Sequence, residues 1–297
     1  MKLTNKLRLP EVVAMAVAND SYTKGDADIS VTELLSPPQL RKLKVAHYDE
    51  LEEDVADRVP SLRGQAFHVI LERAAAGNPD MMIEKTVYSE YAGWKIKGQI
   101  DHVLLSSGEL FDFKETTARK VRGGVLPREW EQQTNIYRRM LHREKGIQIG
   151  AIAVFAFLRD WTKRESKQSQ DYPQAPVVRL EVPVWTDDQA DAFIEERVRL
   201  HQMQEPAACS EEDVWAKADK WAVLKRGNVR AIRVYNNVFD AELHAGQSSA
   251  FYVEHRPGEA VRCQDWCQVS HLCPQWAGDP RNQRVQSVEE SLFNAEV

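Results

Sequence analysis

The sequence predicts an α/β protein, because apolar runs that favour β-strands alternate along the chain with segments that carry helix start and stop signals. The chain has 297 residues, of which 43% are hydrophobic and 28% charged, so it can bury a sizeable core. No apolar run reaches the roughly 18–20 residues that a membrane-spanning helix requires. We therefore expect a globular protein that has no membrane partner.

The N-terminus has some features of a secretion signal. Lys2, Lys6 and Arg8 precede an apolar stretch, but Pro10 and Glu11 interrupt it. An amphipathic helix is the better interpretation of this segment. We therefore expect a cytoplasmic protein.

Three helices are expected in the body of the chain, each flanked by residues that start or stop helices. Gly77 and Gly146 provide C-terminal stops, and Pro127 suits the first turn of a helix. The helices are expected at residues 61–76, 128–145 and 186–204.

Five strands are expected from runs of β-favouring residues. A turn at Ser106-Ser107-Gly108 would join the second and third strands into a hairpin. The strands are expected at residues 82–88, 94–105, 109–114, 149–158 and 177–184.

Four regions are expected along the chain. A helical N-terminal region precedes the α/β core, a segment rich in tryptophan and cysteine follows it, and a polar tail ends the chain. These regions cover residues 1–58, 59–205, 206–280 and 281–297. The formal net charge is −6, so any surface that binds nucleic acid must be local.

Two aspartates and a lysine are expected to meet on the hairpin. Asp112 and Lys114 share one side of their strand, because strand side chains alternate. A two-residue turn at Ser106-Ser107 pairs positions that sum to 213, so Asp101 faces Asp112, whereas a slip of two places Asp101 opposite Lys114. Opposed carboxylates are unfavourable unless a hard cation such as Mg²⁺ or Mn²⁺ binds them. An Asp-x-Lys motif alone is more often part of an ordinary surface hairpin. The residues that accompany it therefore decide whether it indicates a metal site.

The two neighbouring helices supply those residues. His68 and Glu72 share a helical face, and Gly64 leaves room there for another element. Imidazole is a good ligand for metals like Mn²⁺, although a lone histidine in an apolar helix is more often a core residue. Gln133 lies in an otherwise apolar face with Tyr137, where its amide needs a polar partner.

Taken in order, these motifs resemble the RecB-like branch of the PD-(D/E)XK nuclease superfamily, including its phage-type exonucleases. The resemblance covers about residues 28–145, and it implies a restriction-endonuclease-like core with a mixed central sheet flanked by helices. The matching motifs are Gly64-x-x-x-His68-x-x-Leu71-Glu72, Gly98-x-x-Asp101, Asp112-Phe113-Lys114 and Gln133-x-x-x-Tyr137.

The resemblance also implies a role for each matching residue. The implied metal ligands are His68, Asp101, Asp112 and the backbone carbonyl of Phe113. The implied catalytic residues are Lys114, Asp101, Asp112, Gln133 and Tyr137. Of these, Gln133 and Tyr137 would handle the DNA strand.

The four cysteines indicate a second metal centre, because clustered cysteines without a secretion signal more often bind metal than form disulfides. Cys263-x-x-x-Cys267-x-x-x-x-x-Cys273 resembles the last three ligands of the [4Fe–4S] cluster in RecB-like exonucleases such as the AddB nuclease domain and the CRISPR-adaptation exonucleases. Those proteins have two residues between the first pair, and a leading cysteine-proline where this chain has Ser36-Pro37. Cys209 is then the candidate for the fourth ligand.

Alternatives to an iron–sulfur cluster remain open at this centre. Four thiolates also suit Zn²⁺, and His271 permits a Cys₃His zinc site. Any of these metals would be structural and would clamp the C-terminal segment onto the core.

The expected activity is a Mg²⁺- or Mn²⁺-dependent deoxyribonuclease, most simply an exonuclease that acts on DNA ends or single strands. It would serve recombination, repair or phage replication in a bacterial or phage-infected cell, with a recombinase or single-strand-binding protein as a possible partner. The alternatives are a catalytically silent DNA-binding protein on the same fold and a zinc-stabilised interaction protein. A local basic stretch is expected to bind phosphates, and it comprises Arg119, Lys120, Arg122 and Arg128.

Overall fold

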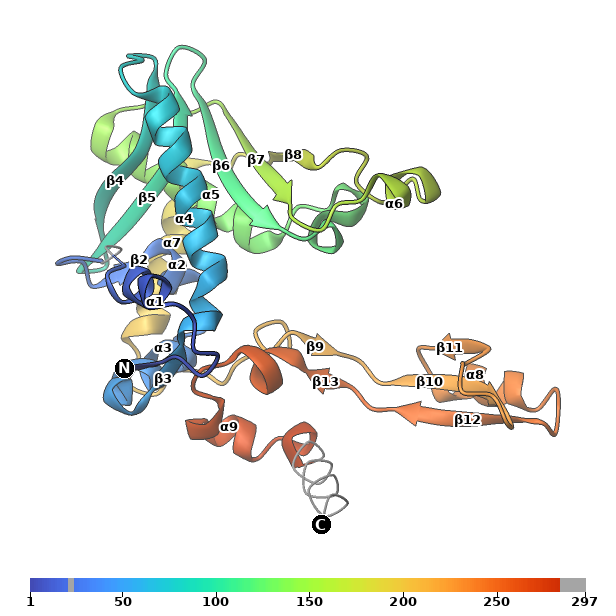
Figure 1. Ribbon diagram of the computed structural model, residues 1–297. Coiled ribbons are helices and arrows are strands. Elements are labelled where there is room, and N and C mark those ends of the chain that lie inside the picture. Colours follow the sequence, from blue (N-terminus) through green and yellow to red (C-terminus); the bar gives the residue numbers. More distant parts are fainter. Residues whose placement is uncertain (21–23, 284–297) are drawn as a thin grey trace. The chain divides into compact units, whose positions relative to one another are not determined.

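The computed structural model describes residues 1–20 and 24–283 (Figure 1). The chain forms two compact units, one made of Met1–Ser36 with Glu52–Gln204 and the other of Pro37–Leu51 with Glu205–Val297. The second unit therefore begins again near the expected start of the cysteine-rich region. Of the expected tail, residues 284–297 lie outside the described residues.

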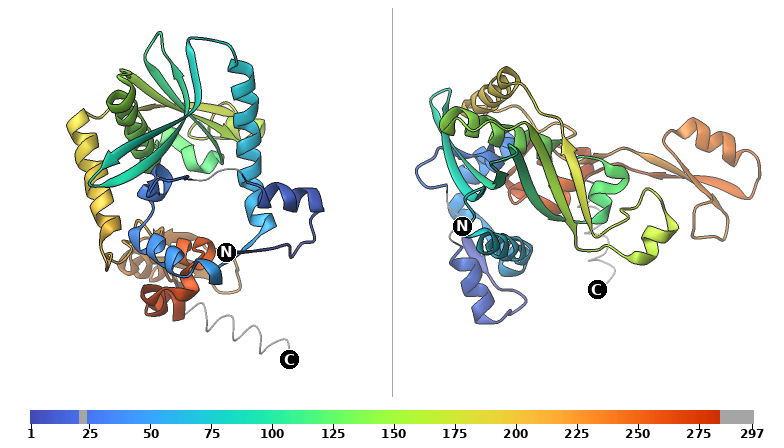
Figure 2. Two further views of the ribbon diagram at one scale, coloured as in Figure 1. Left: turned by 90° about the vertical axis from the view of Figure 1, so that its left-hand side faces the viewer. Right: turned by 90° about the horizontal axis from the view of Figure 1, so that it is seen from above.

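The first unit is built on a six-stranded mixed sheet flanked by helices (Figures 1 and 2). The strand order is β2-β5-β6-β7-β8, and β4 pairs with β5 as well. β2 is parallel to β5 and β6 is parallel to β7, whereas the other neighbours are antiparallel. The strands are β2 (Ile29–Ser30), β4 (Met81–Tyr91), β5 (Trp94–Leu104), β6 (Glu109–Thr116), β7 (Ala151–Leu158) and β8 (Val177–Val182). The expected α/β class, the mixed sheet and all five expected strands are confirmed.

Helices cover the sheet, and the three expected ones are present. The first of them starts earlier than expected, because the Asp54 side chain caps it by accepting a hydrogen bond from the Ala56 amide. The Thr186 side chain starts the third with a capping box. The helices of this unit are α1 (Glu11–Ala18), α2 (Val31–Leu35), α4 (Val55–Ala75), α5 (Arg128–Lys145), α6 (Lys163–Gln168) and α7 (Asp187–Gln202), with a 3₁₀ segment at Ala118–Gly124. β1 (Lys2–Thr4) pairs with β3 (Glu52–Asp54).

Glycine allows a close approach at Gly98, whereas the expectation that Gly64 does so is wrong. A Cβ atom at Gly98 would lie 3.1 Å from the Met140 sulfur and 3.2 Å from the Tyr137 ring, so α5 packs directly on β5 there. A Cβ atom at Gly64 would meet nothing within 4 Å. Gly98 therefore brings α5, with Tyr137, against the strand that carries Asp101.

The β5–β6 hairpin has the expected register. His102 pairs with Phe111 and Leu104 with Glu109, so paired positions sum to 213. The connection is a four-residue turn rather than the expected two-residue turn, since the strands end at Leu104 and Glu109 and Gly108 takes a φ of +64°. The register thus survives the longer turn and places Asp101 beside Asp112.

The second unit combines short helices with small sheets. β10 is the centre of a three-stranded antiparallel sheet of order β11-β10-β12, and β9 pairs with β13. The strands are β9 (Ala216–Lys217), β10 (Lys220–Lys225), β11 (Arg233–Tyr235), β12 (Phe251–Arg256) and β13 (Glu259–Ala260). The helical segments are α3 (Pro38–Ala46), Tyr48–Glu50, α8 (Val238–Ala245), Arg262–Trp266, Ser270–Leu272 and α9 (Pro274–Ala277). Within the described residues, no helix is both long and apolar enough to cross a membrane.

Candidate metal centre

Asp101 lies where the β5–β6 ladder stops. The ladder ends at the His102–Phe111 pair, and one residue further along, the Asp101 Oδ2 atom accepts a hydrogen bond of 2.8 Å from the Phe113 amide. Ile100 and Val103 are both fully buried although they are three residues apart, so the strand alternation changes between them. The side chain of Asp101 therefore replaces a backbone partner at the point where the two strands separate.

Asp112 and Lys114 form a close ion pair on β6. The Lys114 Nζ atom lies 2.9 Å from Asp112 Oδ2 and donates a hydrogen bond of 3.1 Å to Oδ1. Asp112 is 1% exposed, and its Oδ2 atom is among the described buried polar atoms that accept no hydrogen bond of good geometry. Burying a carboxylate oxygen that accepts no hydrogen bond costs free energy unless a cation lies close to it. The ammonium group of Lys114 is such a cation.

The opposite side of β6 is aromatic, as strand alternation requires. Phe113 contacts the rings of Phe155 and Phe157 on β7, with centroids 6.2 Å apart in each case. Phe67 on α4 packs against Phe157 with the ring centroids 4.6 Å apart and the rings tilted by 60°. This cluster fixes α4 against the sheet, and with it the neighbouring residue His68.

His68 lies beside Asp101 together with Glu84, a residue that the sequence did not single out. The His68 Nδ1 atom lies 4.0 Å from Asp101 Oδ1 and 2.6 Å from Glu84 Oε1. His68, Glu84 and Asp101 each offer a ligand atom within 4.8 Å of the other two. They are the one group of three such ligands that the described residues contain, and Asp112 stands outside it, paired with Lys114.

The backbone at Glu84 is unusual. Ile83 pairs with His102 and Lys85 with Ile100, so Glu84 lies opposite Asp101, where the ladder is interrupted. Glu84 has a φ of +48°, which an L-residue adopts at a cost of about 1–3 kcal/mol. Its carboxylate accepts a hydrogen bond of 2.8 Å from the Gln99 amide as well as contacting His68. Local strain of this kind often occurs at functional sites.

The charges and the burial of the site raise the pKa values of Asp101, Lys114 and His68 for different reasons. Burial and the neighbouring Asp112 raise the pKa of Asp101 to about 7. Burial lowers the pKa of Lys114, but Asp112 and Asp101 more than offset it, so the net pKa is raised. The hydrogen bond to Glu84 raises the pKa of His68 despite its burial. The site therefore holds negative charge that its own cations only partly neutralise.

Gln133 and Tyr137 on α5 meet as expected. The Gln133 Nε2 atom donates a hydrogen bond of 2.8 Å to the Tyr137 hydroxyl oxygen, and this satisfies the amide that the sequence left without a partner. Tyr137 is 4% exposed and packs where Gly98 leaves room. Their role toward a DNA strand stays a prediction, as does a metal contact through the Phe113 carbonyl.

The expected basic stretch is partly neutralised. Lys120 pairs with Glu129 at 2.7 Å, and Arg122 pairs with Asp171 at 2.9 Å. Arg119 and Arg128 are exposed. At least two of the four residues predicted to bind phosphates, Lys120 and Arg122, therefore have an acidic partner already.

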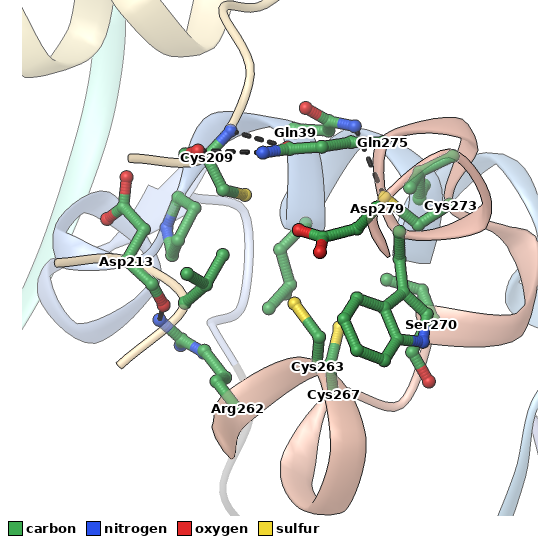
Figure 3. A pocket seen from close by; sticks show the side chains of 16 residues that line it. Gln39, Cys209, Asp213, Arg262, Cys263, Cys267, Ser270, Cys273, Gln275 and Asp279 are labelled. Atoms are coloured by element: carbon green, nitrogen blue, oxygen red, sulfur yellow. Dashed lines mark hydrogen bonds between the residues drawn. The ribbon is translucent and has the colours of Figure 1, made fainter. Parts of the chain in front are cut away.

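The four cysteines line one pocket of the second unit (Figure 3). The side chains of Cys209, Cys263 and Cys267 point into the pocket, and that of Cys273 points into it from the side opposite Cys209. All four are free thiols that are partly buried. The sequence-based choice of these four residues as one ligand set is thus compatible with their placement.

Neighbouring amides support this pocket. Gln275 binds the backbone of Cys209 twice, accepting from its N–H and donating to its carbonyl oxygen at 2.8 Å each. The Gln39 Nε2 atom donates to the Cys273 sulfur at 3.3 Å. Pro37 also lines the pocket, so the segment that follows Ser36 reaches it without a thiol. His271 is exposed and is not part of the lining.

The donor set fits a soft metal centre. Burial and the neighbouring thiols raise the pKa of Cys209 to about 12 and that of Cys263 to about 11, because deprotonation would place several negative charges together. A metal reverses this penalty, since thiolates are its ligands. Among the described residues, no three cysteine sulfurs lie within 4.8 Å of one another.

Comparisons with known proteins do not assign the chain to a family. No family model matches it. No curated protein matches its sequence. Among solved structures it is similar to that titled "Crystal structure of SSO0001", with 17% sequence identity and a TM-score of 0.43 over 65% of this chain and 83% of the other. A likeness this distant carries no argument about function.

Proposed function

We propose that this protein is a divalent-metal-dependent deoxyribonuclease with a PD-(D/E)XK core. The observation that carries the proposal is the gathering of His68, Glu84 and Asp101 within 4.8 Å, beside the buried Asp112–Lys114 pair. Hard oxygen ligands with one imidazole suit Mg²⁺ or Mn²⁺. When bound, such an ion activates water and stabilises the charge that develops on a phosphodiester.

The chain's own residues divide the work. His68, Glu84, Asp101 and Asp112 would hold the ion. Lys114 stays protonated, because the two aspartates raise its pKa, so it donates hydrogen bonds rather than accepting a proton. Its Nζ atom would orient the attacking water and neutralise the charge on the pentavalent phosphorus.

The test is digestion of end-labelled linear and circular DNA with added Mn²⁺. Wild type should cleave in Mn²⁺ and be inactive in EDTA, whereas Lys114→Ala and Asp112→Asn should each lose about a thousandfold or more of the activity. Glu115→Gln is the matched control, since Glu115 follows Lys114 on β6 but pairs with Arg63. Cleavage of linear but not circular DNA identifies an exonuclease.

Two results would remove the proposal. One is undiminished cleavage by Lys114→Ala and Asp112→Asn, which would trace the activity to a contaminant or another site. The other is metal-independent DNA binding without cleavage by wild type, which identifies a catalytically silent DNA-binding protein.

We also propose that Cys209, Cys263, Cys267 and Cys273 hold a [4Fe–4S] cluster with a structural role. The support is the placement of the four thiols around one pocket and the amide that Gln39 donates to Cys273. Protein purified anaerobically should be brown, absorb near 400 nm with a broad band and contain about four irons per chain. A colourless protein with one zinc would contradict the cluster.

A further inference from the structure

The β10–β11 hairpin of the second unit presents a loop on a rigid base. Trp221 pairs with Tyr235, and Val223 with Arg233. Ala222, Val223 and Leu224 of β10 are buried. The backbone N–H of Ile232 donates to the Val223 carbonyl oxygen at 2.8 Å, which closes the loop where it joins β11. The loop therefore has a defined position on this small sheet.

This hairpin carries a local excess of positive charge in an acidic protein. Residues 220–233 include five lysines and arginines and no aspartate or glutamate, whereas the whole chain has a net charge of −6. Lys225, Arg226, Arg230 and Arg233 are all exposed. In the ranges 1–20 and 24–283, none of these four side chains forms an ion pair.

Other cations of the same unit are treated differently. Lys217 on β9 pairs with Glu259, and Arg256 on β12 pairs with Glu254 at 2.8 Å. The exposed cations of the β10–β11 hairpin thus have no acidic partner among the described residues, although Arg233 lies over the Tyr235 ring at 5.1 Å. Such a group of cations favours an anionic partner. Three of the four are arginines, whose planar guanidinium groups can bind two phosphate oxygens at once.

We propose that the loop between β10 and β11 binds the phosphate backbone of DNA, with Arg226 and Arg230 as its principal contacts. The choice of DNA over other polyanions rests on the proposed nuclease function. Binding through phosphates alone is independent of sequence, so the loop would add affinity for any substrate without choosing the cleavage site. It is an additional contact, separate from the predicted stretch at Arg119, Lys120, Arg122 and Arg128.

The experiment compares two double variants of the full chain by fluorescence anisotropy in EDTA, with labelled single-stranded and duplex 20-mers of one sequence. Arg226→Ala/Arg230→Ala removes two unpaired charges, and Lys217→Ala/Arg256→Ala removes two paired charges as the matched control. The first variant should bind at least about tenfold more weakly at low salt. Its plot of log affinity against log salt should be less steep by about 1.8 for duplex or about 1.4 for single strands.

The control variant should keep the wild-type affinity and slope. An unchanged slope in Arg226→Ala/Arg230→Ala, with circular dichroism confirming its fold, would overturn the proposal. Val229 in this loop is 96% exposed, so vesicles of phosphatidylcholine and phosphatidylglycerol form a second arm. Loss of vesicle binding with unchanged DNA binding would replace the DNA with a lipid surface.

The outcome is separable from that of the nuclease proposal. If wild type fails to cleave but Arg226→Ala/Arg230→Ala loses DNA affinity, the loop binds DNA and the nuclease assignment fails. If Lys114→Ala abolishes cleavage while the loop variant binds like wild type, only the inference about the loop fails.

Discussion

The candidate metal site of the first unit and the cysteine pocket of the second both gather groups that repel when ionised, but the two sites limit that repulsion differently. In the first, Lys114 neutralises Asp112, an amide binds Asp101 and His68 contacts Glu84. In the second, raised pKa values keep Cys209 and Cys263 as neutral thiols. The first site is therefore held together by contacts among its own residues, whereas the ionised form of the second would depend on the metal that we propose for it. We expect an exchangeable ion in one and a structural one in the other.

The largest effect should follow from loss of a cysteine ligand. Cys273→Ser should destabilise the second unit by several kcal/mol, because metal-binding energy there is folding energy. EDTA treatment of wild type, which would remove Mg²⁺ or Mn²⁺ from the first site, should lower the unfolding midpoint by less, because that loss is limited to the binding free energy of an exchangeable ion. Calorimetry and metal analysis measure both, and equal losses of stability would erase the distinction between the two centres.

The next effect is a pH-dependent gain in stability from Asp101→Asn without metal. The folded pKa of Asp101 is raised to about 7 from 3.8, so the protonated acid is favoured and stability falls as pH rises between those values. The cost above pH 7 is about 4 kcal/mol at most. In EDTA the variant should be more stable than wild type at pH 8 and similar at pH 4. Urea unfolding measures the stability of both proteins at the two pH values. An Asp101→Asn variant less stable than wild type at pH 8 would contradict this account.

A smaller effect is expected for Glu84, the ligand that distinguishes the observed site from the predicted one. Glu84→Gln keeps the size of the side chain but removes its charge, so Mn²⁺ affinity should fall about 10–100-fold. Isothermal titration measures this affinity directly. Glu72→Gln is the control, because Glu72 is exposed on α4. If both variants bind Mn²⁺ like wild type, Glu84 only positions His68.

The smallest effects concern the two glycines of the motifs. Gly98→Ala should destabilise by about 1–3 kcal/mol, because its methyl group would meet Met140 and Tyr137 within about 3.3 Å. Gly64→Ala should stabilise by about 0.5–1 kcal/mol, since it lies inside α4 with open space around it. Thermal unfolding compares them, and the same sign for both would mean that α5 does not pack tightly on β5.

The hairpin at the site could be predicted from sequence because strand alternation and pairing are local rules. The expected register placed Asp101 beside Asp112, and a longer turn did not change it. Glu84 could not be found this way, since it reaches His68 only through a left-handed backbone and an interrupted ladder. The sequence signal that could have indicated it is an acidic residue, Glu84, close to the middle of the expected strand at residues 82–88.

The second unit was harder to predict. Its strands are short, and β10 and β12 are separated by 25 residues that include α8. Composition there indicated metal binding through the cysteines but no sheet. The β-favouring segments Phe251-Tyr252-Val253 and Trp221 to Leu224 are the sequence signals for β12 and β10.

The bond from the Phe113 amide to Asp101 has a consequence for ion selectivity. With one lone pair of Oδ2 engaged by the backbone, this carboxylate offers a cation Oδ1 most readily, the atom that lies 4.0 Å from the imidazole of His68. Single-oxygen donation suits a small octahedral ion, whereas calcium commonly takes both oxygens of an acid and more ligands in total. The strand pairing itself would thus disfavour calcium.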